Sequence, residues 1–317
     1  MKAIESAGFD SPSPIQSEFI PIAVRGEDAI GLARTGTGKT TAFVMPILER
    51  IDLTQDLPQA LILAPTRELS EQVAKEAEKL SLHSPCRTVC LVGGRPIRTQ
   101  INQLKKGPQL IVGTPGRIID LIRRRELQLK TIKIVVLDEA DRMLDIGFRP
   151  DIERILRRCP KNRQTLLLSA TMADEIEQIT QKYMNSPNRV DVTEGDAPAQ
   201  QIEQFYLTVD SDRKFGALVH VLRQERPQQV IVFTRTKIGT DKLFNKFRAK
   251  LGKQVASMHG DLPQSKRDRV MKKFRAAEIR MLIATDVVGR GIDISGISHI
   301  INYDIPEYCD DYLHRVG

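Results

Sequence analysis

The segment that decides the fold runs from Asp28 to Thr40 and reads Asp-Ala-Ile-Gly-Leu-Ala-Arg-Thr-Gly-Thr-Gly-Lys-Thr. It begins with an apolar run typical of a buried strand, and a stretch of helical pattern follows it. A glycine-rich turn between a strand and a helix lets backbone N–H groups converge on phosphate oxygens, and the helix dipole favours the same anion. Lys39 can reach the outer phosphates, and Thr40 can bind Mg²⁺. We therefore predict a nucleotide-phosphate loop, although Ala33 stands where the common pattern has its first glycine. A turn that binds nothing is the alternative.

Short apolar runs recur along the chain, separated by amphipathic stretches of helical period. The first series lies at residues 28–32, 60–64, 88–92, 110–113, 134–138 and 165–169, and the second at 229–234, 254–258, 280–285 and 299–303. Strands that alternate with helices predict parallel sheets covered by helices on both faces. Residues 194–201 are small, polar and broken by Gly and Pro, which is typical of a linker. We expect an α/β chain of two tandem domains, at residues 1–194 and 204–317, joined by a linker at residues 195–203.

The composition excludes several classes of protein. Of 317 residues, 41% are hydrophobic and 28% are charged, so a buried core is expected and global disorder is not. No apolar run approaches the roughly 20 residues that cross a bilayer, and we expect a cytoplasmic protein that does not contact a membrane. The net charge of +8 suits a surface that binds a polyanion. Only 5% of the residues are aromatic, which disfavours a protein that stacks many bases.

Two adjacent carboxylates, Asp138 and Glu139, follow the apolar run at residues 134–137. Ligands of parallel sheets bind at the carboxyl ends of strands. Asp138 is expected to hold Mg²⁺, and Glu139 to polarise a water for attack on a γ-phosphate. An acidic cluster is usually a solvated loop, but the phosphate loop in the same predicted domain makes this pair a catalytic candidate.

A series of short motifs around Leu137–Asp141 resembles the DEAD-box ATP-dependent RNA helicases of superfamily 2. Gly8-Phe9 with residues 12–16 is similar to the family's adenine-binding motif, and the loop with Ala33 matches the family's own variant. The remaining matches follow in order, at residues 65–69, 93–94, 114–117, 169–171, 232–234, 259–261, 264 with 267, and 285–293. The resemblance implies two RecA-like domains, ATP and Mg²⁺ as cofactors, and RNA as the partner.

The resemblance also implies a role for individual residues. The implied catalytic residues are Lys39, Asp138, Glu139, Ser169 and Thr171. The implied nucleotide-binding residues are Phe9, Gln16, Thr35, Gly36, Thr37, Gly38, Lys39, Thr40, Gly291 and Asp293. The implied RNA-binding residues are Pro65, Thr66, Arg67, Gly94, Thr114, Gly116, Arg117, Gly260, Arg267 and Thr285. Thr40 and Asp138 are the expected metal ligands.

The predicted RNA-binding residues make physical sense without the family. Threonines that follow strands offer hydroxyl and N–H donors, and the arginines offer charge. Such donors bind the phosphodiester backbone and read no bases, so we expect binding that depends little on sequence and weakens with salt. For Arg67 and Arg117, a surface ion pair is the alternative.

The family resemblance implies that ATP and RNA bind across a cleft between the domains, and that closure separates RNA strands locally. An ATP-gated RNA clamp that serves as an assembly platform, with little unwinding, is the alternative. Gln16 and Asp141 disfavour a DNA translocase. The chain ends at Gly317, inside the family's last motif, so we expect an incomplete second domain and weak hydrolysis, because the arginines that follow in the family are not included. Protein partners are expected to bind flanking regions.

Overall fold

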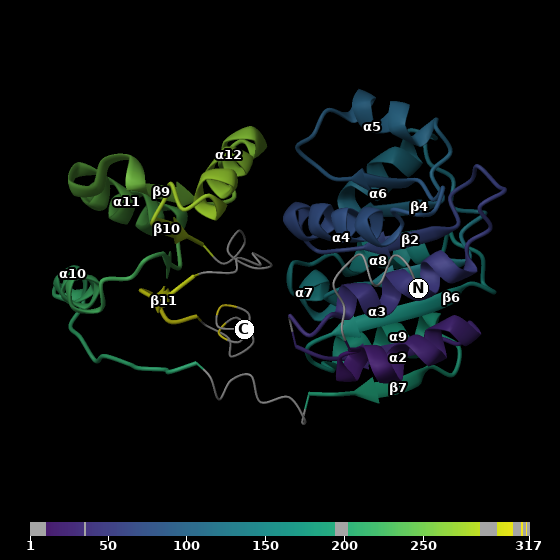
Figure 1. Ribbon diagram of the computed structural model, residues 1–317, viewed down its shortest axis with the longest axis horizontal. Coiled ribbons are helices and arrows are strands. Elements are labelled where there is room, and N and C mark those ends of the chain that lie inside the picture. The colour runs from purple at the N-terminus through teal and green to yellow at the C-terminus, as the bar shows by residue number, and fades with distance from the viewer. Residues whose placement is uncertain are drawn as a thin grey trace. The chain divides into compact units, whose positions relative to one another are not determined.

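The computed structural model describes residues 11–34, 36–193, 202–285 and 297–306, together with residues 312 and 315. The chain divides into two compact units, Met1–Ala197 and Pro198–Gly317, called unit 1 and unit 2 below. Figure 1 labels the elements of both. Most of the predicted linker, residues 195–201, lies outside the described residues.

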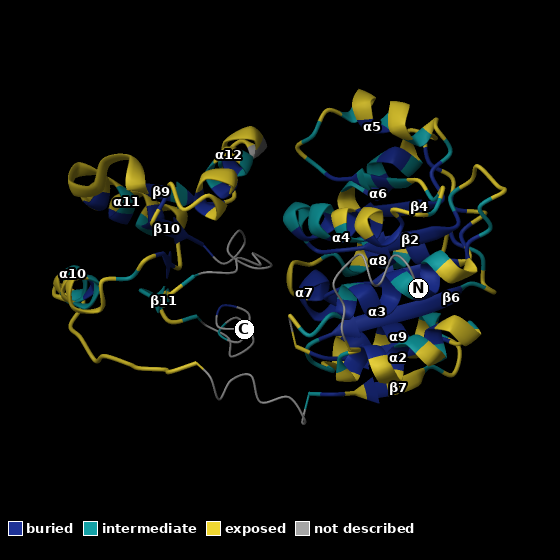
Figure 2. Ribbon diagram, in the orientation of Figure 1, coloured by how far each residue is buried: buried dark blue, intermediate teal, exposed yellow. Residues whose placement is uncertain are grey.

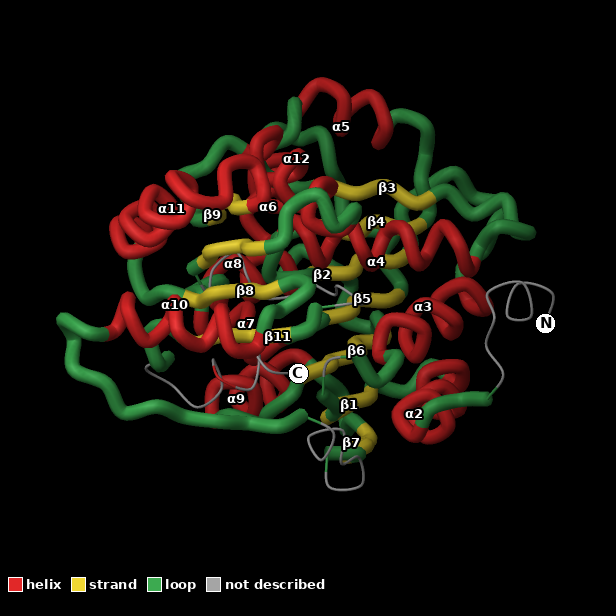
Figure 3. The backbone as a smooth tube through the Cα atoms, turned by 60° about the vertical axis from the view of Figure 1, so that its left-hand side comes forward, coloured by secondary structure: helices red, strands yellow, loops and turns green. Residues whose placement is uncertain are grey.

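Unit 1 is built on one parallel sheet. Its described strands are β1 (Ala29–Leu32), β2 (Ala60–Leu63), β3 (Thr88–Leu91), β4 (Leu110–Gly113), β5 (Ile134–Leu137), β6 (Gln164–Ser169) and β7 (Asn188–Asp191). They lie in the order β3-β4-β2-β5-β6-β1-β7, which Figure 3 shows as one stack of strands. Every described pair is parallel, as between Leu32 of β1 and Ser169 of β6.

Helices cover both faces of this sheet. They are α2 (Pro14–Arg25), α3 (Lys39–Arg50), α4 (Arg67–Leu80), α5 (Ile97–Leu104), α6 (Pro115–Arg123), α7 (Ala140–Asp145), α8 (Arg149–Leu156) and α9 (Asp174–Tyr183). Successive strand residues enter opposite cores: Val136 packs with α2, α3 and α4, whereas Val135 and Leu137 pack with α6 to α9. Most strands are therefore buried on both sides, as their dark blue colour in Figure 2 shows.

Unit 2 repeats the plan with a smaller described sheet. Strands β8 (Val230–Phe233), β9 (Val255–Met258), β10 (Met281–Ala284) and β11 (His299–Asn302) run parallel in the order β11-β8-β10-β9. Helices α10 (Lys214–Glu225) and α11 (Lys237–Leu251) pack on one face, and α12 (Gln264–Arg275) packs on the other. The short 3-10 helix η2 (Gly252–Gln254) follows α11. The predicted α/β class with two tandem parallel-sheet domains is confirmed.

The edge strand β7 was not predicted from the sequence. Only Val190 of its four residues is buried, so the strand lacks the apolar run that marks its neighbours. Its pairing with β1 at the edge of the sheet explains why one buried side chain suffices. Within the described residues, no helix is both long and apolar enough to cross a membrane.

Candidate functional site

The carboxyl ends of the unit 1 strands bring the predicted site residues to one edge of the sheet, because all the strands are parallel. The order of the strands divides this edge into two halves. The neighbours β5, β6 and β1 are followed by the acidic pair, Ser169–Thr171 and the glycine loop, which form the nucleotide half. The neighbours β3, β4 and β2 are followed by the predicted RNA residues, which form the RNA half.

The glycine loop after β1 turns through left-handed backbone at two positions. Gly36 has φ 80° and Gly38 has φ 88°, a region in which a Cβ atom is strained. Lys39 then starts α3, and its Nζ donates to the carbonyl of Ala33 at 2.7 Å. The hydroxyl of Thr37 donates to the carbonyl of Arg34 at 2.8 Å. The lysine side chain thus folds back to the residue that follows β1. A Cβ at Gly36 would meet nothing within 4 Å.

Gln16 of α2 supports the same loop. Its Nε2 donates to the carbonyl of Gly38 at 3.2 Å, and its Oε1 accepts the backbone N–H of Ser13 at 3.0 Å. The side chain is 6% exposed. One amide therefore caps the first turn of α2 and holds the phosphate loop. The pattern of Ser13 and Gln16 could have indicated the cap, but not the bond to Gly38.

The two carboxylates after β5 are both buried. Burial and the neighbouring Glu139 raise the pKa of Asp138 to about 7, against the opposing effect of Lys39. Glu139 has φ 49°, an uncommon backbone conformation for a residue with a side chain. The tight turn allows α7 to begin directly after the acidic pair.

Glu139 pairs with an arginine that was not predicted from the sequence. Arg142 Nη1 donates to Glu139 Oε2 at 2.9 Å, one turn along α7. The two side chains are 1% and 6% exposed. Nε and Nη2 of Arg142 have no hydrogen-bond partner among the described residues. The i,i+3 spacing from Glu139 is the signal that could have identified this arginine.

Asp141 joins the acidic loop to the loop after β6. Its Oδ2 accepts the backbone N–H groups of Ala170 and Thr171 at 2.8 and 3.1 Å, while its Oδ1 accepts that of Arg142. The neighbouring Ser169 is fully buried, and its hydroxyl has no hydrogen-bond partner within the described part of the chain. The side chain of Asp141 thus holds Ala170 and Thr171 to the acidic loop through their backbone N–H groups.

The RNA half contains two threonines that begin helices. Thr66 precedes α4 and caps it, because its hydroxyl accepts the N–H of Leu69 at 3.2 Å. Thr114 precedes α6 and is 8% exposed, with no cap bond from its side chain. Gly94 and Gly116 are exposed, whereas Pro65 is buried.

The arginines of the RNA half are only partly exposed. Arg67 lies against Gly93, where an added Cβ would come within 3.3 Å of its guanidinium. The guanidinium of Arg117 donates to the carbonyl of Arg95 at 3.3 to 3.4 Å and is 11% exposed. Burial lowers the pKa of Arg117. Arg117 Nε lies 4.0 Å from Oδ2 of Asp120, so the two residues form no close ion pair.

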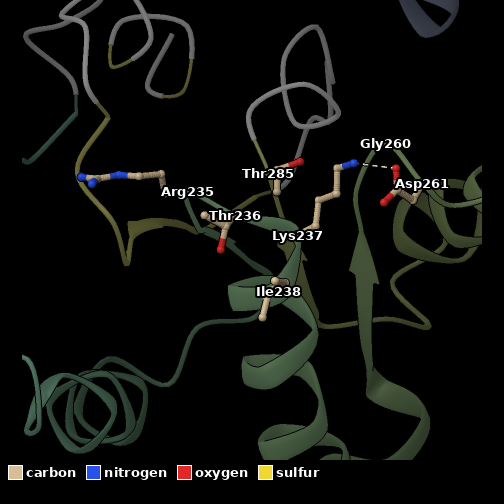
Figure 4. A pocket seen from close by; sticks show the side chains of 7 residues that line it. All are labelled: Arg235, Thr236, Lys237, Ile238, Gly260, Asp261 and Thr285. Atoms are coloured by element: carbon tan, nitrogen blue, oxygen red, sulfur yellow. Dashed lines mark hydrogen bonds and ion pairs between the residues drawn. The ribbon is translucent and has the colours of Figure 1, made fainter.

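Unit 2 has a pocket of about 630 Å³ at the carboxyl ends of β8, β9 and β10. Gly260 and Thr285, both predicted RNA contacts, line it (Figure 4). Lys237 and Asp261 form an ion pair of 2.6 Å at the pocket wall. Arg235 and Lys237 also line the pocket, although neither was predicted. Their position as two basic residues just after a predicted strand could have indicated them as candidates. Arg267, on α12, is 8% exposed.

Four predicted nucleotide contacts lie outside the described residues. They are Phe9, Thr35, Gly291 and Asp293.

The nucleotide half fits a magnesium ion. Mg²⁺ takes one or two carboxylates and completes its octahedron with phosphate oxygens and waters. The buried Asp138 has a raised pKa, so positive charge beside it would be favourable. Within the described ranges, no group of three or more His, Cys, Asp or Glu side chains is arranged to hold a metal.

Two family models match the chain. The DEAD/DEAH box helicase model matches residues 13–179, and the helicase conserved C-terminal domain matches residues 213–317.

Whole-chain relatives extend this match. The chain is 47% identical to the DEAD-box ATP-dependent RNA helicase CshA of Geobacillus kaustophilus, covering 100% of this chain and 68% of that protein. It is 45% identical to the protein of the same name from Bacillus cereus, covering 100% of this chain but only 60% of that protein. The chain thus spans less than two thirds of the length of several relatives.

Solved structures share the fold. A structure of S. cerevisiae Dbp5 bound to RNA and ADP BeF3 matches with a TM-score of 0.89 and 34% identity, covering 99% of this chain and 82% of that chain. A DEAD box protein from Methanococcus jannaschii matches with a TM-score of 0.60 and 40% identity, covering 99% and 85%.

Proposed function

Because this chain belongs to the DEAD-box helicase family, we propose that it binds ATP and single-stranded RNA and couples ATP hydrolysis to local separation of RNA strands. The domains predicted at residues 1–194 and 204–317 would each contribute loops to both ligands. RNA would be bound through its backbone, with little dependence on base sequence.

The nucleotide half of unit 1 would bind the phosphates of ATP. Backbone N–H groups of the glycine loop and the amino terminus of α3 favour anions. Lys39, which now donates to Ala33, would turn its charge to the outer phosphates. Gln16 would hold the loop and, with its remaining hydrogen-bonding capacity, contact the adenine edge.

Hydrolysis needs a water aligned with the γ-phosphate. Thr40 and Asp138 would hold Mg²⁺, which supplies positive charge to the phosphates when bound. Glu139 would orient the attacking water and accept its proton. Burial of this carboxylate among fixed groups reduces the reorganisation that the reaction requires.

The observation that carries the proposal is the contact between Asp141 and the loop after β6. One carboxylate oxygen binds two consecutive N–H groups, so a shift in the acidic loop moves Ala170 and Thr171 with it. These loops follow the neighbouring strands β5 and β6, and β5 also borders β2. This connectivity supports communication between nucleotide and RNA.

Phosphate release and separation of a short fluorescent RNA duplex would be measured with ATP. We expect hydrolysis that rises when single-stranded RNA is added, and strand separation that requires ATP. Lys39→Ala should lose binding of a fluorescent ATP analogue, whereas Glu139→Gln should bind it and fail to hydrolyse ATP.

Two outcomes would contradict the proposal. Retention of RNA with a non-hydrolysable analogue, but no strand separation at any ATP concentration, would favour the clamp. Stimulation by single-stranded DNA and not by RNA would favour a DNA translocase.

A further inference from the structure

Unit 2 has a second concave surface that the proposed function does not use. It is a groove of about 370 Å³ between α10 and α11. Its floor is apolar and includes Val219 and Leu222 of α10 and the buried Phe247 of α11. Leu251, at the end of α11, forms part of the rim and is 38% exposed.

Four exposed cations also line this groove. Arg223 and Arg226 lie at the end of α10, Lys250 lies at the end of α11, and Arg280 precedes β10. No described acidic residue lines the groove, and none of the four cations has a side-chain partner among the described residues. A cation near the carboxyl end of a helix can stabilise the helix by interacting with its dipole. Because Arg280 belongs to no helix, this effect does not account for the whole cluster.

The groove lies at the opposite edge of the sheet from the predicted RNA residues. Arg280 and Val230 stand at the amino ends of β10 and β8, whereas Thr285 follows the carboxyl end of β10. A four-residue strand spans about 13 Å, which separates the two surfaces. A molecule in the groove would therefore leave the pocket of Figure 4 accessible.

We propose that this groove binds a short acidic segment of a partner protein, anchored by an aromatic or aliphatic side chain. An apolar anchor fits the floor of a groove of this size. The four cations come from three places, the end of α10, the end of α11 and the residue before β10, so several spaced carboxylates complement them better than the single charge of a fatty acid. A charged segment of this kind can be disordered alone and become ordered in the groove.

Nucleic acid is the less favoured occupant. Phosphates would meet the cations but leave the apolar floor without a partner. Phe215 lines the groove, and its ring centroid lies 5.5 Å from that of Phe247. Nζ of Lys246 lies 4.4 Å from the centroid of the Phe215 ring. This ring is thus engaged by the protein, which disfavours stacking on a base.

The peptide-binding measurement needs neither ATP nor RNA, so its result does not depend on the proposed helicase activity. A phage library of random short peptides would be selected against the chain, and the enriched peptides would be synthesised with a fluorescein label. We expect the enriched peptides to contain Asp and Glu residues beside Phe or Leu. In fluorescence anisotropy, Arg226→Glu with Arg280→Glu should weaken peptide binding by about tenfold or more, and Leu251→Ser by about fivefold.

Lys272→Glu with Arg275→Glu is the matched control, because it removes two exposed cations from α12 on the other face of the sheet. It should leave peptide binding unchanged. Thermal unfolding would verify that each variant is folded. Enriched peptides that lack acidic residues, or that bind all variants equally, would overturn the proposal. A loss of RNA affinity in the groove variant alone would also overturn it, because the cations would then belong to an RNA surface.

Discussion

Arg142 and Glu139 form a buried ion pair in unit 1, with Nη1 of the arginine 2.9 Å from Oε2 of the glutamate. Glu139 is the proposed base that orients the attacking water. The hydrogen bond from Arg142 therefore also fixes the orientation of the Glu139 carboxylate. Burying two charged groups costs free energy because both lose their hydration. Nη1 of Arg142 donates to Glu139, whereas Nε and Nη2 have no partner in the described part of the chain. The pair therefore makes both stability and turnover sensitive to either residue.

Arg142→Met should destabilise unit 1 by about 3 kcal/mol, because it leaves the buried Glu139 carboxylate without its cation. Combining it with Glu139→Gln should regain most of the loss, since no unpaired charge is then buried. Scanning calorimetry of the three variants measures the effect. A double variant as unstable as Arg142→Met alone would show that the arginine acts through packing and not through its charge.

Asp141→Asn should uncouple the acidic loop from the loop after β6. The carboxylate accepts N–H groups on both oxygens, whereas an amide must turn its NH₂ group toward one of them. We expect the rate of RNA-stimulated ATP hydrolysis to fall about tenfold, which corresponds to an activation free energy higher by roughly 1.4 kcal/mol. Binding of a fluorescent ATP analogue should be retained. Asp174→Asn, on an exposed residue at the start of α9, is the control. Equal losses in both variants would refute the coupling.

Gly36→Ala and Gly38→Ala separate backbone strain from side-chain clash in the phosphate loop. Both glycines have positive φ, so either alanine should cost about 1 kcal/mol in strain. A Cβ at Gly36 meets open space, whereas one at Gly38 would clash with Gln16 Nε2. ATP-analogue titration should therefore show the larger loss of affinity for Gly38→Ala. Equal losses would mean that Gln16 does not support the loop.

Much of the fold was predictable because most of its strands are buried on both faces. Runs such as Ile134–Leu137 carry no polar residue, and their ends agree with the structure to within one residue. The edge strand at Asn188–Asp191 escaped prediction, since pairing on one side requires only Val190 to be buried. The sequence pattern of a strand reflects which of its side chains are buried, and this edge strand buries only one.

The placement of the site residues could be predicted less well than the fold. The motifs show which loops carry chemistry, and parallel strands bring those loops to one edge. Side-chain partners depend on tertiary packing: neither the bond from Gln16 to Gly38 nor the buried pairing of Arg142 follows from composition. The sheet order that separates β3, β4 and β2 from β5, β6 and β1 also requires the structure.

Arg117→Gln should reduce the salt dependence of RNA binding. If Arg117 contacts a phosphate, the slope of log affinity against log salt should fall by about 1. Arg124→Gln is the matched control from the end of the same helix, because Arg124 is 54% exposed and pairs with Asp120 at 2.7 Å. Anisotropy titrations of labelled single-stranded RNA at several salt concentrations measure both slopes. An unchanged slope for Arg117→Gln would assign this arginine to its contact with the Arg95 carbonyl and remove it from the RNA surface.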